Sequence, residues 1–310
     1  MANKTRTIFE IFLQGIGLYF TNIDRFVWYM FLPVAGQIIG AGLIIFILYA
    51  YREYNALILS NIPALKSPLY MKISIGIILL IPIIIWLKSF WDYITAYGAV
   101  NSMTENMLKS ERVYDFNAHR LLVTHRRLPF IGLWVMYGAL ILLTSIPIFL
   151  VFGLVLLVYY AFIFQVFTFE PELSPYDCFK KSSTYVSGHF KRTLYMIMLI
   201  GGLTYIIIPQ IVLAFAQTVK AVDYLKGILT NCISIPALDP LNMVISAMGF
   251  AQITPEGAAL FFVKLWIVIA VIQIMLPLRV ICMCLWYKNF YNDSGYMKKL
   301  DDKVLKRAGR

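Results

Sequence analysis

The ionisable residues inside apolar stretches are the first candidates for chemistry. Lys88 and Asp92 lie four residues apart in WLKSFWDYITAYG, a spacing that lets them pair along one face of a helix. Arg279 lies in another apolar stretch, MLPLRVICMCLWYK. Charged side chains within a membrane are costly, and they usually pair or line a water-filled cavity. We therefore expect Lys88, Asp92 and Arg279 to form an intramembrane charge cluster.

This expected cluster has two kinds of interpretation. In the first, it moves a proton or a substrate, and the protein is a transporter or lipid translocator. In the second, the charges hold helices together, or each side chain reaches separately to the membrane interface. The sequence favours the structural interpretations over transport.

A second group of ionisable residues is basic and lies between apolar stretches. Such residues fix the orientation of neighbouring membrane spans. They also attract anionic lipid, at roughly 1 kcal/mol for each Lys or Arg near the surface. The sequence thus predicts a basic surface that either only anchors spans or binds anionic lipid or an acidic partner protein. Its members are Arg120, Arg126, Arg127, Lys180, Lys181, Lys191 and Arg192.

The segment SPYDCFKKSSTYVSGHFKR, residues 174–192, shows how such residues are positioned. Ser174 followed by Pro175 is typical of a helix N-cap and first turn, and Asp177 resembles the acidic half of a capping box. Phe179 and Val186 then share one face at helical spacing. We expect an amphipathic helix in the membrane interface, with its aromatic residues toward the membrane and its lysines toward the headgroups.

Composition indicates the class of protein. The chain has 310 residues, of which 60% are hydrophobic and 14% charged, whereas soluble domains carry about 25% charged residues. The mean hydropathy is +0.75. A polytopic membrane protein of the all-α class follows, because the apolar residues come in long blocks. The net charge of +11 then reflects the basic flanks of the spans, and we expect no nucleic-acid partner.

Six blocks are long enough to cross a bilayer, which takes about 20 residues per helix. The uncharged run 129–169 is divided at TSIPIF, where Ser, Thr and Pro interrupt a helix. We expect one transmembrane domain over 1–290 and a basic cytoplasmic tail over 291–310. The predicted spans are 27–50, 73–98, 129–147, 149–169, 194–217 and 257–287.

Most of the 27 Lys and Arg residues fall in the segments on one side of these six spans. Cytoplasmic loops are enriched in Lys and Arg. The distribution therefore predicts that both termini are cytoplasmic, with amphipathic helices on the same side.

Small residues indicate one packing face. Gly36 and Gly40 form a GxxxG pair in the first span, and small residues let membrane helices approach closely. We expect internal packing here, with a homodimer face as the alternative.

Motifs of known catalytic chemistry are missing from the sequence. It contains no GxSxG, HExxH, P-loop or GxGxxG pattern. Its four cysteines do not show the spacing of a metal site or of a disulfide framework. We expect no metal and no cofactor, and we favour a non-enzymatic role.

The stretch FTFEPELSPYDCFKKSSTYVSGHFKRTLYMIMLIGGL, residues 167–203, resembles a recurring segment of bacterial integral membrane proteins. These include the membrane domain of some glycerophosphodiester phosphodiesterases and six-span relatives without the soluble enzyme domain. The shared features are Glu170, the step Lys181-Ser182 and the exit Gly188-His189-Phe190-Lys191. The resemblance covers spans three to six and implies a six-span layout in a bacterial inner membrane. It implies no phosphodiesterase activity, because the soluble enzyme domain is absent.

Overall fold

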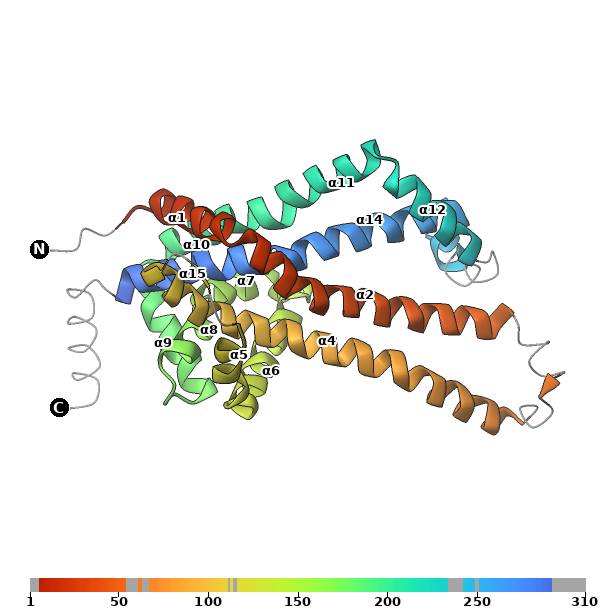
Figure 1. Cartoon of the computed structure of the whole chain (residues 1–310), viewed down its shortest axis with the longest axis horizontal. Coiled ribbons are helices and arrows are strands. Elements are labelled where there is room, and N and C mark those ends of the chain that lie inside the picture. The colour runs from red at the N-terminus through yellow and green to blue at the C-terminus, as the bar shows by residue number, and fades with distance from the viewer. Residues whose placement is uncertain are drawn as a thin grey trace, which may run out of the picture. The chain divides into compact units, whose positions relative to one another are not determined.

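The computed structural model describes residues 6–53, 61–62, 67–110, 112–113, 116–233, 242–248 and 251–291. Helices make up all the regular structure in these ranges (Figure 1). The predicted tail, beyond its first residue, lies outside the described residues. The principal elements are α1 (Ile8–Thr21), α2 (Ile23–Glu53), α4 (Pro68–Ser110), α5 (Phe116–Thr124), α6 (Arg127–Thr144), η2 (Pro147–Phe149), α7 (Leu150–Tyr159), α8 (Ile163–Phe169), α9 (Pro175–Ser187), α10 (Phe190–Gly201), η3 (Gly202–Ile207), α11 (Ile208–Thr218), α12 (Ala221–Cys232), α14 (Pro255–Ile274) and α15 (Leu276–Tyr291).

Within the described residues, six helical segments are long and apolar enough to cross a bilayer. They are Ile23–Tyr51, Leu69–Ser110, Arg127–Thr144, Pro147–Phe169, Phe190–Thr218 and Pro255–Phe290. This confirms the all-α class and the six spans, and the chain is a multi-pass membrane protein. Some helices run well beyond the predicted spans. The 43 residues of α4 extend over about 65 Å at 1.5 Å per residue, about twice the hydrocarbon core.

The chain forms two compact units. The first comprises Met1–Trp28, Ile94–Thr204 and Met275–Arg310, and the second comprises Tyr29–Tyr93 and Tyr205–Ile274. The chain therefore passes from one unit to the other within α2, α4 and η3 and at the junction of α14 with α15.

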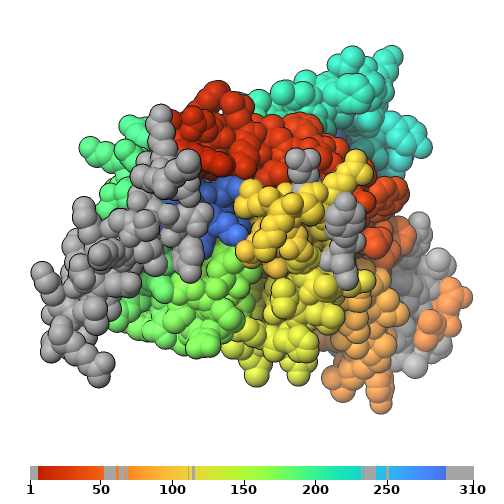
Figure 2. Space-filling model, turned by 60° about the vertical axis from the view of Figure 1, so that its left-hand side comes forward, coloured from red at the N-terminus to blue at the C-terminus, as the bar shows by residue number. Residues whose placement is uncertain are grey.

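The core of the first unit is built around α15. From Leu276 to Tyr287 nearly every residue of this helix is buried, as expected for a helix that is apolar on all sides. Figure 2 shows α15 in blue, framed by α1 in red, by the end of α4 and α5 in yellow, and by α8 and α9 in green. The helix α1 packs directly against α15 and begins with a capping box formed by Thr7 and Glu10.

A break in the fourth apolar segment was not expected from the sequence. The helix α7 ends at Tyr159 and α8 begins at Ile163. Ser182 of α9 satisfies the interrupted backbone, because its hydroxyl donates to the carbonyl of Tyr159 at 2.9 Å and accepts from the N–H of Phe162 at 3.0 Å. A side chain from a neighbouring helix can thus replace lost helical hydrogen bonds within the membrane.

The second unit contains most of α2, the first part of α4, and α11, α12 and α14. Close contacts between α2 and α4 are made at glycines of α2, since a Cβ atom on Gly40 would lie 2.8 Å from Cβ of Trp86. The amide of Gln273 on α14 donates to that of Gln37 on α2 at 3.0 Å. The helix α12 packs against α14.

Candidate functional site

The helix α9 begins where the sequence predicts. Ser174 is the N-cap, and its hydroxyl accepts from the backbone N–H of Asp177 at 3.2 Å, while Pro175 lies in the first turn. The same hydroxyl donates to the Asp177 carboxylate at 2.6 Å. An N-cap of this kind stabilises a helix by about 1 kcal/mol. The start of α9 is therefore fixed by its local sequence.

The apolar face of α9 is turned toward the protein. Cys178, Phe179, Tyr185 and Val186 are buried, and the helix packs on α6, α7 and α8. Our expectation that these aromatic residues face the membrane is therefore wrong for the described structure. The apolar face of α9 is covered by neighbouring helices of the protein instead of by lipid. Burial also raises the pKa of the Cys178 thiol to about 11.

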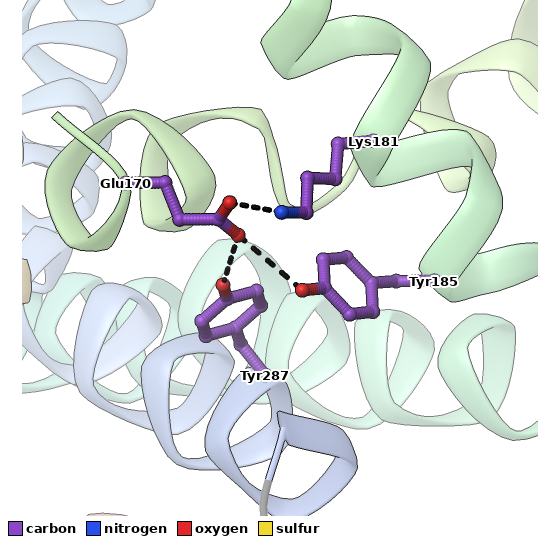
Figure 3. A network of polar contacts seen from close by, with 4 residues as sticks. All are labelled: Glu170, Lys181, Tyr185 and Tyr287. Atoms are coloured by element: carbon purple, nitrogen blue, oxygen red, sulfur yellow. Dashed lines mark hydrogen bonds and ion pairs between the residues drawn. The ribbon is translucent and has the colours of Figure 1, made fainter. Parts of the chain in front are cut away.

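Glu170 follows α8 directly and joins it to α9 and α15 (Figure 3). Its carboxylate forms an ion pair with Lys181 of α9. It also accepts hydrogen bonds from the hydroxyl groups of Tyr185, at 3.3 Å, and Tyr287, at 3.2 Å. The Glu170 side chain is only 18% exposed, and a covered carboxylate is stable only with such partners. The Lys181 ammonium is thus used in an ion pair within the protein.

Arg126 is likewise bound to the protein itself. Its guanidinium donates to the carbonyls of Phe167, at 2.8 Å, and Leu173, at 3.0 Å. It also lies over the Phe167 ring, 4.0 Å from the centroid. Burial lowers the pKa of Arg126, while a smaller influence from Cys178 raises it. Arg126 and Lys181 therefore both bind the segment that connects α8 to α9.

A third cation, Lys288, also contacts the end of α8. Lys288 on α15 pairs with Glu105 at 3.3 Å and lies 4.8 Å from the centroid of the Phe169 ring. The Tyr287 ring also stacks on Phe169, with 5.7 Å between the ring centroids. These contacts link the end of α8 to α15.

Most of the remaining predicted basic residues are exposed to solvent. Lys180, Lys191 and Arg192 are exposed, as is Arg127 at the start of α6, while Arg120 on α5 is half-buried. For Lys180, Lys191 and Arg192 the described residues provide no ion-pair partner. The turn between α9 and α10 also forms a hollow of about 500 Å³, lined by residues 187–192. We call Lys180, Lys191 and Arg192 the α9–α10 basic surface.

The expected intramembrane charges are distributed between the two units. Lys88 and Asp92 form an ion pair at 3.2 Å, with the Lys88 side chain 75% exposed and the Asp92 side chain 17% exposed. Both residues belong to the second unit, whereas Arg279 belongs to the first. A cluster of all three stays a prediction.

The packing glycines lie against the neighbouring helix of their own chain. In the second unit, Gly36 faces Ser89 and Gly40 faces Trp86, both on α4. This is the internal-packing geometry, and the close approach leaves no room for a side chain at either glycine.

Sequence analysis named Glu170 and Lys181 as shared features of the resemblance but did not join them with Tyr185 and Tyr287 into a site. Glu170 and Tyr287 are 117 positions apart, so no local pattern connects them. A local signal that could have added Tyr185 was its spacing from Lys181, which puts both on one helix face. Within the described residues there is no group of three His, Cys, Asp or Glu side chains that could hold a metal ion.

Comparisons with known proteins give no relative. No family model, curated protein or solved structure matches the chain. The resemblance of residues 167–203 to bacterial six-span membrane proteins stays a prediction.

Proposed function

We propose that this membrane protein binds anionic lipid headgroups through the α9–α10 basic surface and has no enzymatic role. The supporting observation is the division of the basic residues into two sets. Lys181 and Arg126 are used inside the fold, whereas Lys180, Lys191 and Arg192 are exposed. Either set of basic residues could fix the orientation of the membrane spans, but only the exposed set is available to a ligand.

The charge around this surface favours an anionic ligand. After Asp177 the sequence contains no acidic residue until Asp223, so Lys191 and Arg192 have no acidic neighbour close to them along the chain. Anionic lipid on the cytoplasmic side attracts such residues. We place both termini in the cytoplasm, because most Lys and Arg residues lie in the segments on one side of the six spans. The resemblance of residues 167–203 favours a bacterial inner membrane.

Native mass spectrometry of the gently solubilised protein tests this proposal. We expect anionic phospholipid to remain bound to the wild type and to be lost when Lys180, Lys191 and Arg192 are all changed to Gln. A matched control changes Lys72, Lys220 and Lys226 to Gln, which removes the same charge from the second unit. We expect the control to retain its lipid.

Two results would overturn the proposal. In the first, the triple variant and its control retain equal amounts of anionic lipid. In the second, the wild type carries no anionic lipid but retains a stoichiometric protein partner that the triple variant loses, and the basic surface is then a protein-docking surface.

A further inference from the structure

A small hollow lies where α1, α10 and α15 meet in the first unit. Its volume is about 270 Å³, near the lower end of the roughly 300–1,000 Å³ typical of small-molecule sites. Two arginines line it, Arg6 just before α1 and Arg192 at the start of α10, together with Thr7, Ile8 and Trp286. A hollow lined by two arginines, and of a size below that of drug-like ligands, suits a small anionic group.

Arg6 is positioned by α15. The side-chain amide of Asn289 accepts from the backbone N–H of Arg6 at 3.2 Å and donates to its carbonyl at 3.5 Å. The Arg6 guanidinium donates to the neutral side chain of Gln14 at 2.5 Å, so it keeps its full positive charge. The main chain of Arg6 is thus tied to the same helix that forms the base of the hollow.

Arg192 is positioned by the residue that follows it. Thr193 is buried, and its hydroxyl accepts a hydrogen bond from the indole N–H of Trp286 at 3.3 Å. This contact ties the first turn of α10 to α15. Arg192 also lines the larger hollow of residues 187–192, which places Lys191 next to the same region.

The charges of the hollow favour a phosphate group. Arginine binds phosphate through paired N–H donors, and two arginines can hold one phosphate from two sides. One carboxylate lies nearby, that of Glu10, and it accepts from the backbone N–H of Thr7 at 2.8 Å within the capping box. Two cations of the hollow, Arg6 and Arg192, therefore stand against one carboxylate that already has a backbone donor.

Exposed apolar side chains continue from both arginines. One turn beyond Arg6, Phe9 on α1 is 62% exposed, and one turn beyond Arg192, Tyr195 on α10 is 59% exposed. Leu13 and Met198 extend the two apolar rows. A free phosphate would make no use of these rows, whereas the acyl chains of a lipid would cover them.

From these contacts we infer that the hollow between Arg6 and Arg192 holds the phosphodiester of one anionic phospholipid, with its acyl chains along Phe9 and Tyr195. This inference rests on the proposed function and makes it specific. It assigns one defined headgroup site within a surface that would otherwise attract lipid only by charge.

Titration of the full-length protein with phosphatidylglycerol in detergent, followed by native mass spectrometry, tests the site. We expect Arg6→Gln and Arg192→Gln each to weaken binding of the first lipid about tenfold or more, because each removes a charge-assisted hydrogen-bond donor group. Arg192→Lys keeps the charge but not the paired donors, and we expect a partial loss. Lys72→Gln removes an exposed cation of the second unit, outside both the hollow and the basic surface, and should change binding by less than about twofold.

The arms of the experiment separate the competing explanations. If Arg6→Gln and Arg192→Gln bind like Lys72→Gln while the triple variant of the basic surface still loses lipid, the defined site is overturned and the general proposal stands. If the triple variant also binds normally, both fail. Displacement of the lipid by an equal concentration of glycerol phosphate would overturn the lipid assignment in favour of a soluble phosphate ester. Each variant is first checked for an unchanged melting temperature.

Discussion

At the scale of single residues, two adjacent lysines of α9 have different surroundings. Lys181 is half-buried and paired with Glu170, whereas Lys180 is exposed. We expect Lys181→Gln to lower the free energy of unfolding by about 1–3 kcal/mol, since it leaves a covered carboxylate without its cation. Lys180→Gln is the matched control and should stay within about 0.5 kcal/mol of the wild type. Denaturant titration in mixed micelles measures both, and equal losses would contradict the assignment of Lys181 to the interior.

The Cys178 thiol provides a pH-dependent test at the same scale. Because burial raises its pKa from 9.0 to about 11, the folded protein keeps this proton at pH values where the unfolded chain loses it. The contribution of Cys178 to stability is therefore full below pH 9 and declines as the pH rises from about 9 to about 11. Iodoacetamide at pH 8 should leave Cys178 unmodified in the folded protein and alkylate it after denaturation in SDS. Rapid alkylation of Cys178 in the folded protein, located by peptide mass spectrometry, would refute its burial.

At the scale of elements, the α7–α8 break depends on one hydroxyl. Ser182→Ala leaves the carbonyl of Tyr159 and the N–H of Phe162 without the partner they have now. We expect a loss of about 1–3 kcal/mol in the free energy of unfolding. The neighbour Ser183 is the control, because its hydroxyl bonds only to the Lys180 carbonyl of its own helix. Equal stability of Ser182→Ala and Ser183→Ala would show that Ser182 does not support the break.

Contact between α2 and α4 gives a second element-scale prediction. A methyl group on Gly40 would meet the backbone N of Trp86 at 2.9 Å, whereas a methyl group on Gly42 meets nothing within 4 Å. We expect Gly40→Ala to destabilise the protein by about 1–3 kcal/mol because the helices must move apart. Gly42→Ala should be neutral or raise stability by up to about 1 kcal/mol. The same unfolding titration compares them, and the reverse order would contradict the internal packing of Gly40.

At the scale of the whole molecule, an even number of spans places both termini on one side of the membrane. Together with the distribution of Lys and Arg, this predicts cytoplasmic termini. We expect a fluorescent protein fused at either end to fluoresce in a bacterial host and alkaline phosphatase fused at either end to be inactive. Active phosphatase at one end alone would mean that one of the six apolar segments does not cross the bilayer.

The sequence by itself determined the class of the protein and much of its layout. Six blocks of apolar residues require six helices, because a bilayer leaves backbone groups no partner except those within the segment. The start of α9 was equally readable, since Ser174, Pro175 and Asp177 act through neighbours along the chain. These properties depend on local interactions and on solvent, so a linear pattern contains them.

Only the tertiary structure decided which cations face outward. The sequence does not distinguish the basic residues Lys180, Lys181, Arg126 and Arg192 from one another. In the folded chain Lys181 binds Glu170, and Arg126 binds the carbonyls of Phe167 and Leu173, partners that lie 11 to 47 positions away. The burial of the apolar face of α9 against protein was also decided there. The physical reason is the same in both cases. An apolar helix face can be buried against either protein or lipid, and a lysine can pair with either a carboxylate or a lipid headgroup. Which of these contacts forms depends on which partner the folded chain brings near.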